Sequence, residues 1–274
     1  MPSSVTTSPL APGRGLVADI AMLAREIPLF PVDRAMRLDD VAAARAAARQ
    51  RIGWAAVFLK AYGLVARDMP VLRSWIAGRF VPCLATSAES VAVLAVNRGT
   101  GGLDRLFFPR LKRPEATPLT VLQRFIDRCA AEPIEQMFKR QLELDALPRP
   151  LRRTILRWNL RSTSPKRPSR VGTFSLSTLA GLQATNRFHP TLCTTSLSYG
   201  PLEPDGRCLV TVIADHRVLD GAAVALTLAR LEQVLATEIA AELRAIREPD
   251  ASVSPGRRGR PEARPQGGDP AAAA

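Results

Sequence analysis

Apolar residues recur at three- and four-residue spacing in five segments of the chain, which predicts amphipathic helices. The segments are residues 16–25, 38–50, 52–67, 119–129 and 222–243. The apolar side of the third segment includes Trp54, Phe58 and Val65. This helix is expected to end before Pro70, because a residue that precedes proline disfavours helical conformation.

Shorter apolar segments between these helices predict strands. They are residues 28–36, 90–96, 173–176, 194–199 and 208–214. The segment 90–96 reads SVAVLAV, a continuous apolar run that is typical of a strand buried on both faces. Helices and strands mixed around one core predict an α/β or α+β fold, a two-layer sandwich with a mixed sheet and flanking helices.

The pattern also predicts the domain boundaries. Residues 1–13 are rich in proline, serine and threonine and are expected to be flexible, and residues 248–274 are low-complexity sequence and are expected to be disordered. Residues 14–247 remain as a single domain. No apolar run reaches the roughly 18 residues of a membrane span, and the N-terminus has no apolar signal region, so the cytoplasm is the expected compartment.

Composition narrows the class of protein. Of 274 residues, 46% are hydrophobic and 23% charged, which excludes collagen-like, coiled-coil and wholly disordered chains. Four cysteines stand far apart without a CxxC pair, so reduced thiols are expected rather than a zinc site or disulfides. With only two histidines, a multi-histidine metal site is excluded and no metal is expected.

The net charge of +13 is concentrated in residues 139–170. This segment contains ten basic and two acidic residues, a net charge of +8. Such a cluster would attract anionic surfaces such as cofactor phosphates or acidic lipids, but an ordinary solvated surface is an equal alternative. No zinc finger, RNP pattern or basic zipper accompanies it, so no specific nucleic-acid partner is expected. Within it, residues 147–160 predict a basic amphipathic helix, at a membrane surface or docked on its own domain.

The segment 214–221, ADHRVLDG, is the strongest candidate for chemistry. An apolar strand delivers Asp215, His216 and Arg217, and the chain then turns at Asp220 and Gly221 into the last helix. A histidine at a strand end with an acid four residues later suits a general base. From the residues alone, a structural histidine is the alternative.

The same segment resembles the DHRxxDG motif of the dihydrolipoamide acyltransferases, the E2 components of 2-oxo-acid dehydrogenase complexes. A related HxxxDG occurs in chloramphenicol acetyltransferase. The resemblance extends in the same order over nearly all of 14–247. It includes GTFSLSTL at 172–179, TSLSYG at 195–200, SVAV at 90–93, and FLKAYGLVA at 58–66 with Pro70 and Trp75 downstream.

This resemblance implies a fold and a reaction. The fold would be a chloramphenicol-acetyltransferase-like two-layer α/β sandwich that assembles as a homotrimer, with the active site in a channel between subunits. The reaction would move an acyl group between coenzyme A and a thiol, hydroxyl or amine, with acyl-CoA as substrate and neither metal nor prosthetic group. No residue is assigned to the cofactor.

The resemblance also assigns roles to two residues. His216 matches the general base, which takes the proton of the attacking group. Ser177 matches the hydroxyl that donates a hydrogen bond to the tetrahedral oxyanion, a donor whose loss costs on the order of 3 kcal/mol. An ordinary strand-end serine is the alternative for Ser177.

Three further residues receive structural roles by the same resemblance. Asp220 matches the acid that pairs with an arginine and braces the loop bearing His216. Arg14 is the candidate partner, with Arg25 and Arg34 nearby. Gly221 is expected to permit close packing of strand and helix.

The chain also departs from the family. About thirteen residues precede the domain, too few for a lipoyl domain, so the chain is expected to carry no lipoyl group of its own. Segments 97–113 and 133–170 are longer and more charged, and His189 is expected to be structural. The leading hypothesis is a stand-alone CoA-dependent acyltransferase with a small acceptor. The alternatives are a non-catalytic trimeric scaffold or partner-binding protein, and a peripheral membrane acyltransferase acting on a lipid-like acceptor.

Overall fold

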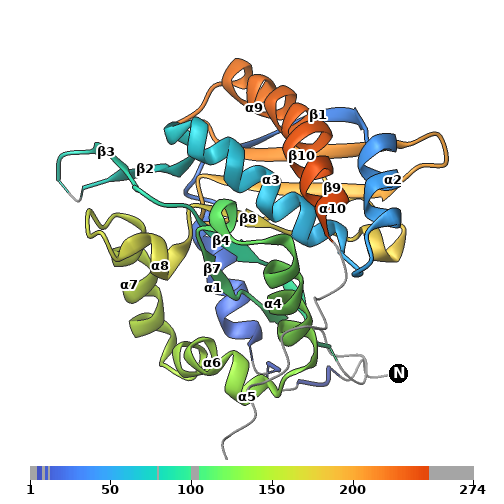
Figure 1. Cartoon of the computed structure of the whole chain (residues 1–274). Coiled ribbons are helices and arrows are strands. Elements are labelled where there is room, and N and C mark those ends of the chain that lie inside the picture. Colours follow the sequence, from blue (N-terminus) through green and yellow to red (C-terminus); the bar gives the residue numbers. More distant parts are fainter. Residues whose placement is uncertain (1–4, 8–9, 12, 79, 100–104, 247–274) are drawn as a thin grey trace, which may run out of the picture.

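A six-stranded mixed sheet forms the centre of the protein (Figure 1). The computed structural model describes residues 5–7, 10–11, 13–78, 80–99 and 105–246. The strand order is β1-β10-β9-β8-β4-β7, with β1 (Leu29–Arg37), β4 (Val91–Leu94), β7 (Arg110–Lys112), β8 (Phe174–Leu176), β9 (Thr195–Leu202) and β10 (Arg207–Asp215). Strand β8 is parallel to both of its neighbours, and the other pairs are antiparallel. The predicted mixed sheet is confirmed.

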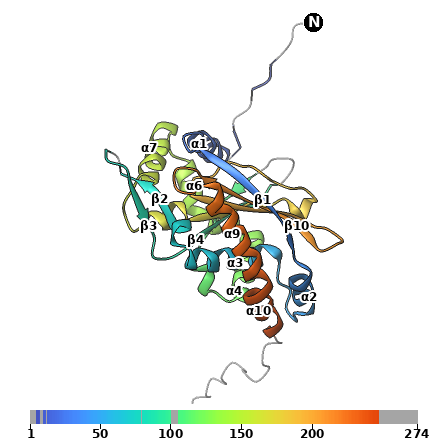
Figure 2. The ribbon, with the colours of Figure 1, turned by 90° about the horizontal axis from the view of Figure 1, so that it is seen from above.

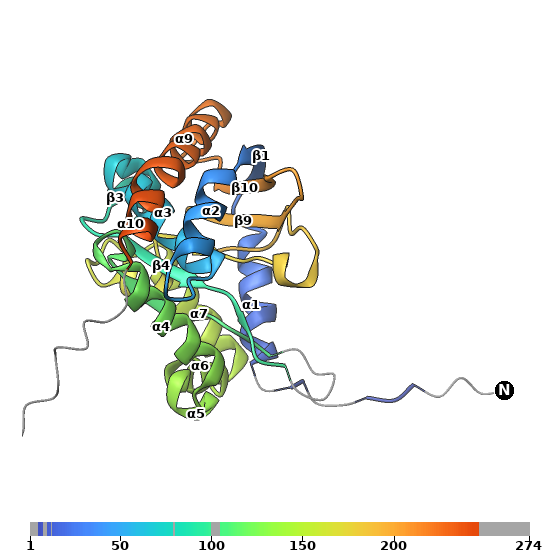
Figure 3. The same ribbon diagram turned by 45° about the vertical axis from the view of Figure 1, so that its right-hand side comes forward.

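Helices and short turns surround this sheet. The helices are α1 (Arg14–Ala24), α2 (Asp39–Ala47), α3 (Trp54–Asp68), α4 (Leu119–Ala131), α5 (Ile134–Met137), α6 (Lys139–Asp145), α7 (Arg149–Leu160), α8 (Arg167–Val171), α9 (Gly221–Val234) and α10 (Ala240–Ala245). A π-helical turn, Leu235–Ile239, joins the last two. Figures 1 and 3 show α3, α9 and α10 on one side of β9 and β10. Figure 2 shows α1, α6 and α7 gathered at another side of the molecule, away from α2 and α10.

The predicted flexible segment 1–13 lies partly outside the described residues, and the predicted tail 248–274 lies wholly outside them.

The two faces of the sheet differ in chemistry. Because side chains alternate along a strand, β10 directs Val210, Val212 and Ala214 into the main hydrophobic core, which also holds Phe174, Leu176 and Leu197 from the neighbouring strands. Many of the opposite positions are small and polar: Ser175 and Ser177 at β8, Ser196 and Ser198 on β9, and Thr211 on β10. The second face of the sheet therefore carries hydroxyl groups beside apolar side chains such as Ile213 and Val93.

The long segment 133–170 forms α5 to α8, and one buried carboxylate ties it to the N-terminal helix. Asp19 of α1 is 1% exposed and accepts hydrogen bonds from Arg152 Nε and Arg153 Nε, both at 2.6 Å. Burial raises the pKa of this carboxyl, but the hydrogen bonds from Arg153 and Arg152 outweigh it, so the pKa lies below its ordinary value. Helix α7 is thus docked on its own domain, one of the two alternatives left open by the sequence.

We expect Asp19→Ala to lower the free energy of unfolding by about 3–5 kcal/mol, because it leaves two arginines without the buried carboxylate that they share. Glu26→Gln is the matched control, since the Glu26–Arg157 pair is 2.8 Å long but about half exposed. It should cost less than about 1 kcal/mol. Urea unfolding measures both variants. Equal losses in the free energy of unfolding would contradict the role of Asp19 in anchoring α7 to α1.

The stabilisation by Asp19 also has a defined pH dependence. It is complete above the ordinary aspartate pKa of about 3.9. Because the pKa is lowered in the folded state, the contribution is lost as the pH falls from there through the folded-state pKa. Unfolding curves of wild type and Asp19→Ala should therefore converge at low pH.

Candidate functional site

His216 stands directly after β10, in the turn that leads to α9. Its backbone N–H donates to the Pro28 carbonyl at 3.0 Å, and its ring lies 4.6 Å from the Phe30 ring, centroid to centroid. Its Nδ1 is 3.4 Å from Asp220 Oδ1, and the side chain is 55% exposed. The imidazole is therefore held by its neighbours and still open to a reactant.

The buried acid of the motif is Asp215, which holds the turn together. Asp215 is 5% exposed, and its carboxylate accepts from Arg217 Nε at 2.9 Å, from an Arg217 terminal nitrogen at 2.7 Å and from the Arg217 backbone N–H at 3.0 Å. These bonds raise the pKa of the Arg217 guanidinium. Within the motif, the arginine–aspartate pair is therefore formed by Arg217 and Asp215, two residues apart in the sequence.

The expected Arg14–Asp220 brace is not formed within the chain. Arg14 begins α1, while Asp220 lies beyond the other end of this helix, next to the strand end where Leu29 pairs with Asp215. The length of α1, about 16 Å, separates them. The Asp220 carboxylate is 85% exposed and contacts His216 instead. Arg34, one of the alternatives, pairs with Glu232 at 2.7 Å.

The role expected for Gly221 is also corrected. A Cβ atom built at this position would meet no heavy atom within 4 Å. Close packing of strand and helix therefore does not require a glycine at the start of α9.

Two aspartate variants separate the local pair from the expected brace. We expect Asp215→Asn to lower the free energy of unfolding by about 1–3 kcal/mol, because a buried charge-assisted pair loses its charge. Asp220→Asn, at an exposed carboxylate, should change it by less than about 0.5 kcal/mol. Denaturant unfolding of both variants tests this. A larger loss in the free energy of unfolding for Asp220→Asn than for Asp215→Asn would favour the expected brace at Asp220.

Ser177 follows β8 on the hydroxyl-bearing side of the sheet. Its backbone N–H donates to the Leu197 carbonyl at 3.0 Å, which continues the pairing of β8 with β9. Its Oγ accepts a hydrogen bond from Asn186 Nδ2 at 3.4 Å. The hydroxyl is thereby positioned while its own proton remains available to another acceptor.

Ser177 and His216 lie toward opposite ends of the strands. In the sheet register, Leu176 is level with Leu197, which is level with Val212. Ser177 follows Leu176 in one direction, and His216 follows Val212 in the other, because β10 is antiparallel to β9. At about 3.3 Å per residue, roughly 17 Å along the strands separates them. One chain does not bring the two side chains together.

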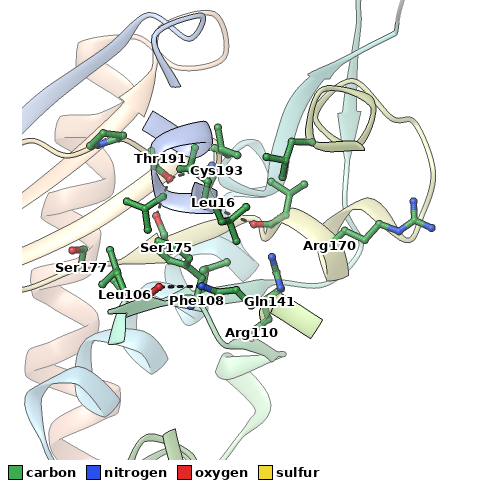
Figure 4. A pocket seen from close by; sticks show the side chains of 18 of the residues that line it. Leu16, Leu106, Phe108, Arg110, Gln141, Arg170, Ser175, Ser177, Thr191 and Cys193 are labelled. Carbon is green, nitrogen blue, oxygen red and sulfur yellow. Dashed lines mark hydrogen bonds between the residues drawn. The ribbon is translucent and has the colours of Figure 1, made fainter. Parts of the chain in front are cut away.

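A cavity of about 410 Å³ opens beside Ser177 (Figure 4). Most of its wall is aliphatic or aromatic, from α1, β4, α6, α7 and the 189–193 segment. Figure 4 shows Ser175, Thr191 and Cys193 near Leu16, with Leu106, Phe108, Gln141 and Arg110 across from them and Arg170 extending away. Gln141 is fixed in this wall, because its amide accepts from the Phe108 N–H and donates to the Leu106 carbonyl. A cavity of this size and lining suits a small organic molecule.

A chain of hydroxyl groups runs along the cavity from His189. His189 Nε2 lies 2.7 Å from Ser196 Oγ, Ser175 donates to Ser196 at 2.6 Å, and Ser175 Oγ is 3.0 Å from Thr191 Oγ1. Burial lowers the pKa of His189 to about 4, so the ring is neutral at pH 7. This arrangement could not be predicted from the sequence, since His189 has no motif partner.

The basic cluster at 139–170 is largely engaged within the chain. Besides Arg152 and Arg153, Arg157 pairs with Glu26, and Arg167 is 2% exposed beneath the Trp75 ring. These contacts do not favour the anionic surface that the sequence left open. Within the described residues, no helix combines the length and apolar character needed to cross a membrane. In the same part of the chain, no cluster of three or more histidine, cysteine or acidic residues is arranged to hold a metal ion.

No family model and no curated protein matches the sequence. Solved structures do match the fold. A dihydrolipoamide acetyltransferase of Azotobacter vinelandii, studied for the catalytic roles of a serine, a histidine and an asparagine, superimposes with a TM-score of 0.63 at 18% identity, over 89% of this chain and 95% of that one. The cubic core of a pyruvate dehydrogenase multienzyme complex gives 0.62 at 20% identity over the same shares.

A third similar structure is a truncated catalytic core of the 2-oxoacid dehydrogenase complex of Thermoplasma acidophilum. Its TM-score is 0.62 at 14% identity, over 85% of this chain and 99% of that one. The chain therefore has the fold of the acyltransferase catalytic cores of 2-oxo-acid dehydrogenase complexes.

Proposed function

We propose that the protein is a CoA-dependent acyltransferase whose site forms between two copies of the chain. The observation that carries this proposal is the placement of His216 and Ser177 at opposite ends of the strands, each accessible and each held by a neighbouring side chain. In a closed ring of identical subunits, one end of a chain meets the other end of the next. A base from one subunit then faces an oxyanion donor from its neighbour.

The reaction uses one base and one hydrogen-bond donor. His216 Nε2 takes the proton of the attacking thiol, hydroxyl or amine as that group bonds to the thioester carbonyl carbon. The carbonyl oxygen becomes an oxyanion, to which the Ser177 hydroxyl donates. The tetrahedral intermediate then releases the coenzyme A thiolate, which recovers the proton from His216.

Asp220 supports this role through the other ring nitrogen. Its carboxylate lies 3.4 Å from His216 Nδ1, which favours the tautomer with the proton on Nδ1 and leaves Nε2 free to accept one. Asp220 is thus a positioning residue in this proposal.

A homotrimer is the assembly that we propose, and an apolar hairpin supports contact between copies. Strands β2 (Ser74–Ala77) and β3 (Cys83–Thr86) form a hairpin that extends from the body (Figure 1). Phe80 is 93% exposed, Val81 78% and Leu84 56%. Apolar side chains gathered in this way are typical of a protein interface.

Calorimetry followed by an acyl-transfer assay tests the proposed function. Coenzyme A and acetyl-CoA are titrated into wild type and His216→Ala, and dihydrolipoamide, small alcohols and amines are then offered as acceptors. We expect saturable binding in both proteins and transfer only in wild type. Absence of binding together with absence of transfer would contradict the proposal and favour the scaffold alternative.

A further inference from the structure

Arg110 differs from the buried arginines Arg73, Arg152 and Arg167 in having no acceptor. Arg152 and Arg153 share Asp19, and Arg167 donates to the Gly172 carbonyl. Arg73 donates to three backbone carbonyls. For Arg110, the described part of the chain provides neither a hydrogen-bond acceptor nor a carboxylate within 4.0 Å.

The position of Arg110 directs this charge into the cavity beside Ser177. The residue lies on β7 opposite Val93 of β4, and both line the cavity. Its side chain is exposed, yet the surrounding protein lowers the pKa of the guanidinium, and the nearby Arg140 adds to this effect. Arg140 lines the same cavity. Two guanidinium groups thus face one space without a counter-ion among the described residues.

The remainder of the wall adds little charge and much apolar surface. Leu16 and Ile20 of α1 and Leu144 and Leu156 of α6 and α7 line the cavity. His189 is neutral at pH 7, because its pKa is lowered to about 4. A guanidinium that the surrounding protein partly desolvates and that has no counter-ion is stabilised by an anionic ligand. The lining therefore fits a ligand with an anionic head and a hydrocarbon body.

We infer that this cavity binds an apolar carboxylic acid, whose carboxylate pairs with Arg110 and whose hydrocarbon portion packs against α1, α6 and α7. A planar guanidinium matches the two oxygens of a carboxylate. The phosphates of coenzyme A fit less well, since strongly hydrated groups gain nothing from these walls. Ser177 lines the same cavity, so, where the proposed function holds, the acyl acceptor is an acid of this kind that also carries the attacking thiol, hydroxyl or amine.

Calorimetric titration with octanoate and with 1-octanol tests the inference without any turnover. Wild type is compared with Arg110→Gln, Arg110→Lys and the control Lys112→Gln, which removes a charge from the same strand outside the cavity lining. We expect saturable octanoate binding to wild type. Arg110→Gln should weaken it at least about tenfold, Arg110→Lys should weaken it less, and Lys112→Gln should change it less than about twofold.

Octanol serves as the internal control for folding of the variants. Its affinity should be the same for wild type and Arg110→Gln, because it contacts only the apolar wall. Three results would overturn the inference: no saturable octanoate binding to wild type, equal octanoate binding by wild type and Arg110→Gln, or loss of coenzyme A binding in Arg110→Gln. The last result would assign the arginine to the cofactor phosphates.

This experiment is separable from the test of the proposed function. His216→Ala should still bind octanoate saturably, because the carboxylate pairs with Arg110 and the hydrocarbon packs against α1, α6 and α7, none of which includes His216. Octanoate binding without acyl transfer to any acceptor would remove the proposed function and leave the carboxylate site. Acyl transfer to uncharged acceptors without octanoate binding would support the proposed function and overturn the carboxylate site.

Discussion

The variant His216→Ala is expected to lose about 10³-fold or more in turnover while remaining folded. General-base catalysis contributes about 10²–10⁴-fold, and here the histidine would also return the proton to the leaving thiolate. The side chain is 55% exposed, so its removal leaves no core cavity. We expect the melting temperature and the affinity for coenzyme A to match those of wild type.

Steady-state acyl-transfer kinetics measure this effect, with circular dichroism melting as the folding control. Turnover within about tenfold of wild type would exclude His216 as the base. A lower melting temperature together with lost activity would indicate a structural role for the histidine, which the sequence left as the alternative.

The second large effect is expected at Ser177. Ser177→Ala should lower kcat by about 10²–10³-fold and leave KM nearly unchanged, because its hydroxyl donates only once the oxyanion forms. Ser177→Cys should fall between wild type and Ser177→Ala, since a thiol is a weaker donor. A change in KM alone, or a change in kcat below about threefold, would remove Ser177 from the reaction.

Much of the fold follows from local pattern. The helices expected at 52–67 and 119–129 correspond to α3 and α4, and the apolar run 208–214 corresponds to β10. These segments carry regular apolar spacing, so their local preference and their tertiary environment agree. The strand that delivers His216 and the turn before α9 were predicted for the same reason.

The elements and contacts that the sequence could not predict depend on distant residues. The hairpin β2–β3 exposes apolar side chains, and β7 has only three residues, so neither carries a periodic signal. Asp19 meets Arg152 and Arg153 across more than 130 residues of chain. The expected pairing of Asp220 with Arg14 does not form within the chain, where Asp220 lies next to His216 and Arg217 pairs with Asp215.

The cavity is the part of the site most remote from any sequence signal. Its wall combines α1, the edge of the sheet and the helices of segment 133–170, which meet only in the folded chain. Arg110 is one basic residue among many, and it is distinguished by its place in the cavity wall without an acceptor among the described residues, which it shares with Arg140. That property belongs to the three-dimensional arrangement and not to the residue type.

If His216 of one copy works with Ser177 of another, mixing two inactive variants should restore activity. His216→Ala and Ser177→Ala proteins, each nearly inactive alone, are unfolded, mixed in equal amounts, refolded and assayed beside wild type treated in the same way. In randomly assembled closed trimers, about one quarter of the interfaces pair an intact histidine with an intact serine. We therefore expect the mixture to recover about one quarter of wild-type activity. Activity no greater than the mean of the two variants alone, in mixtures that have formed mixed oligomers, would contradict it.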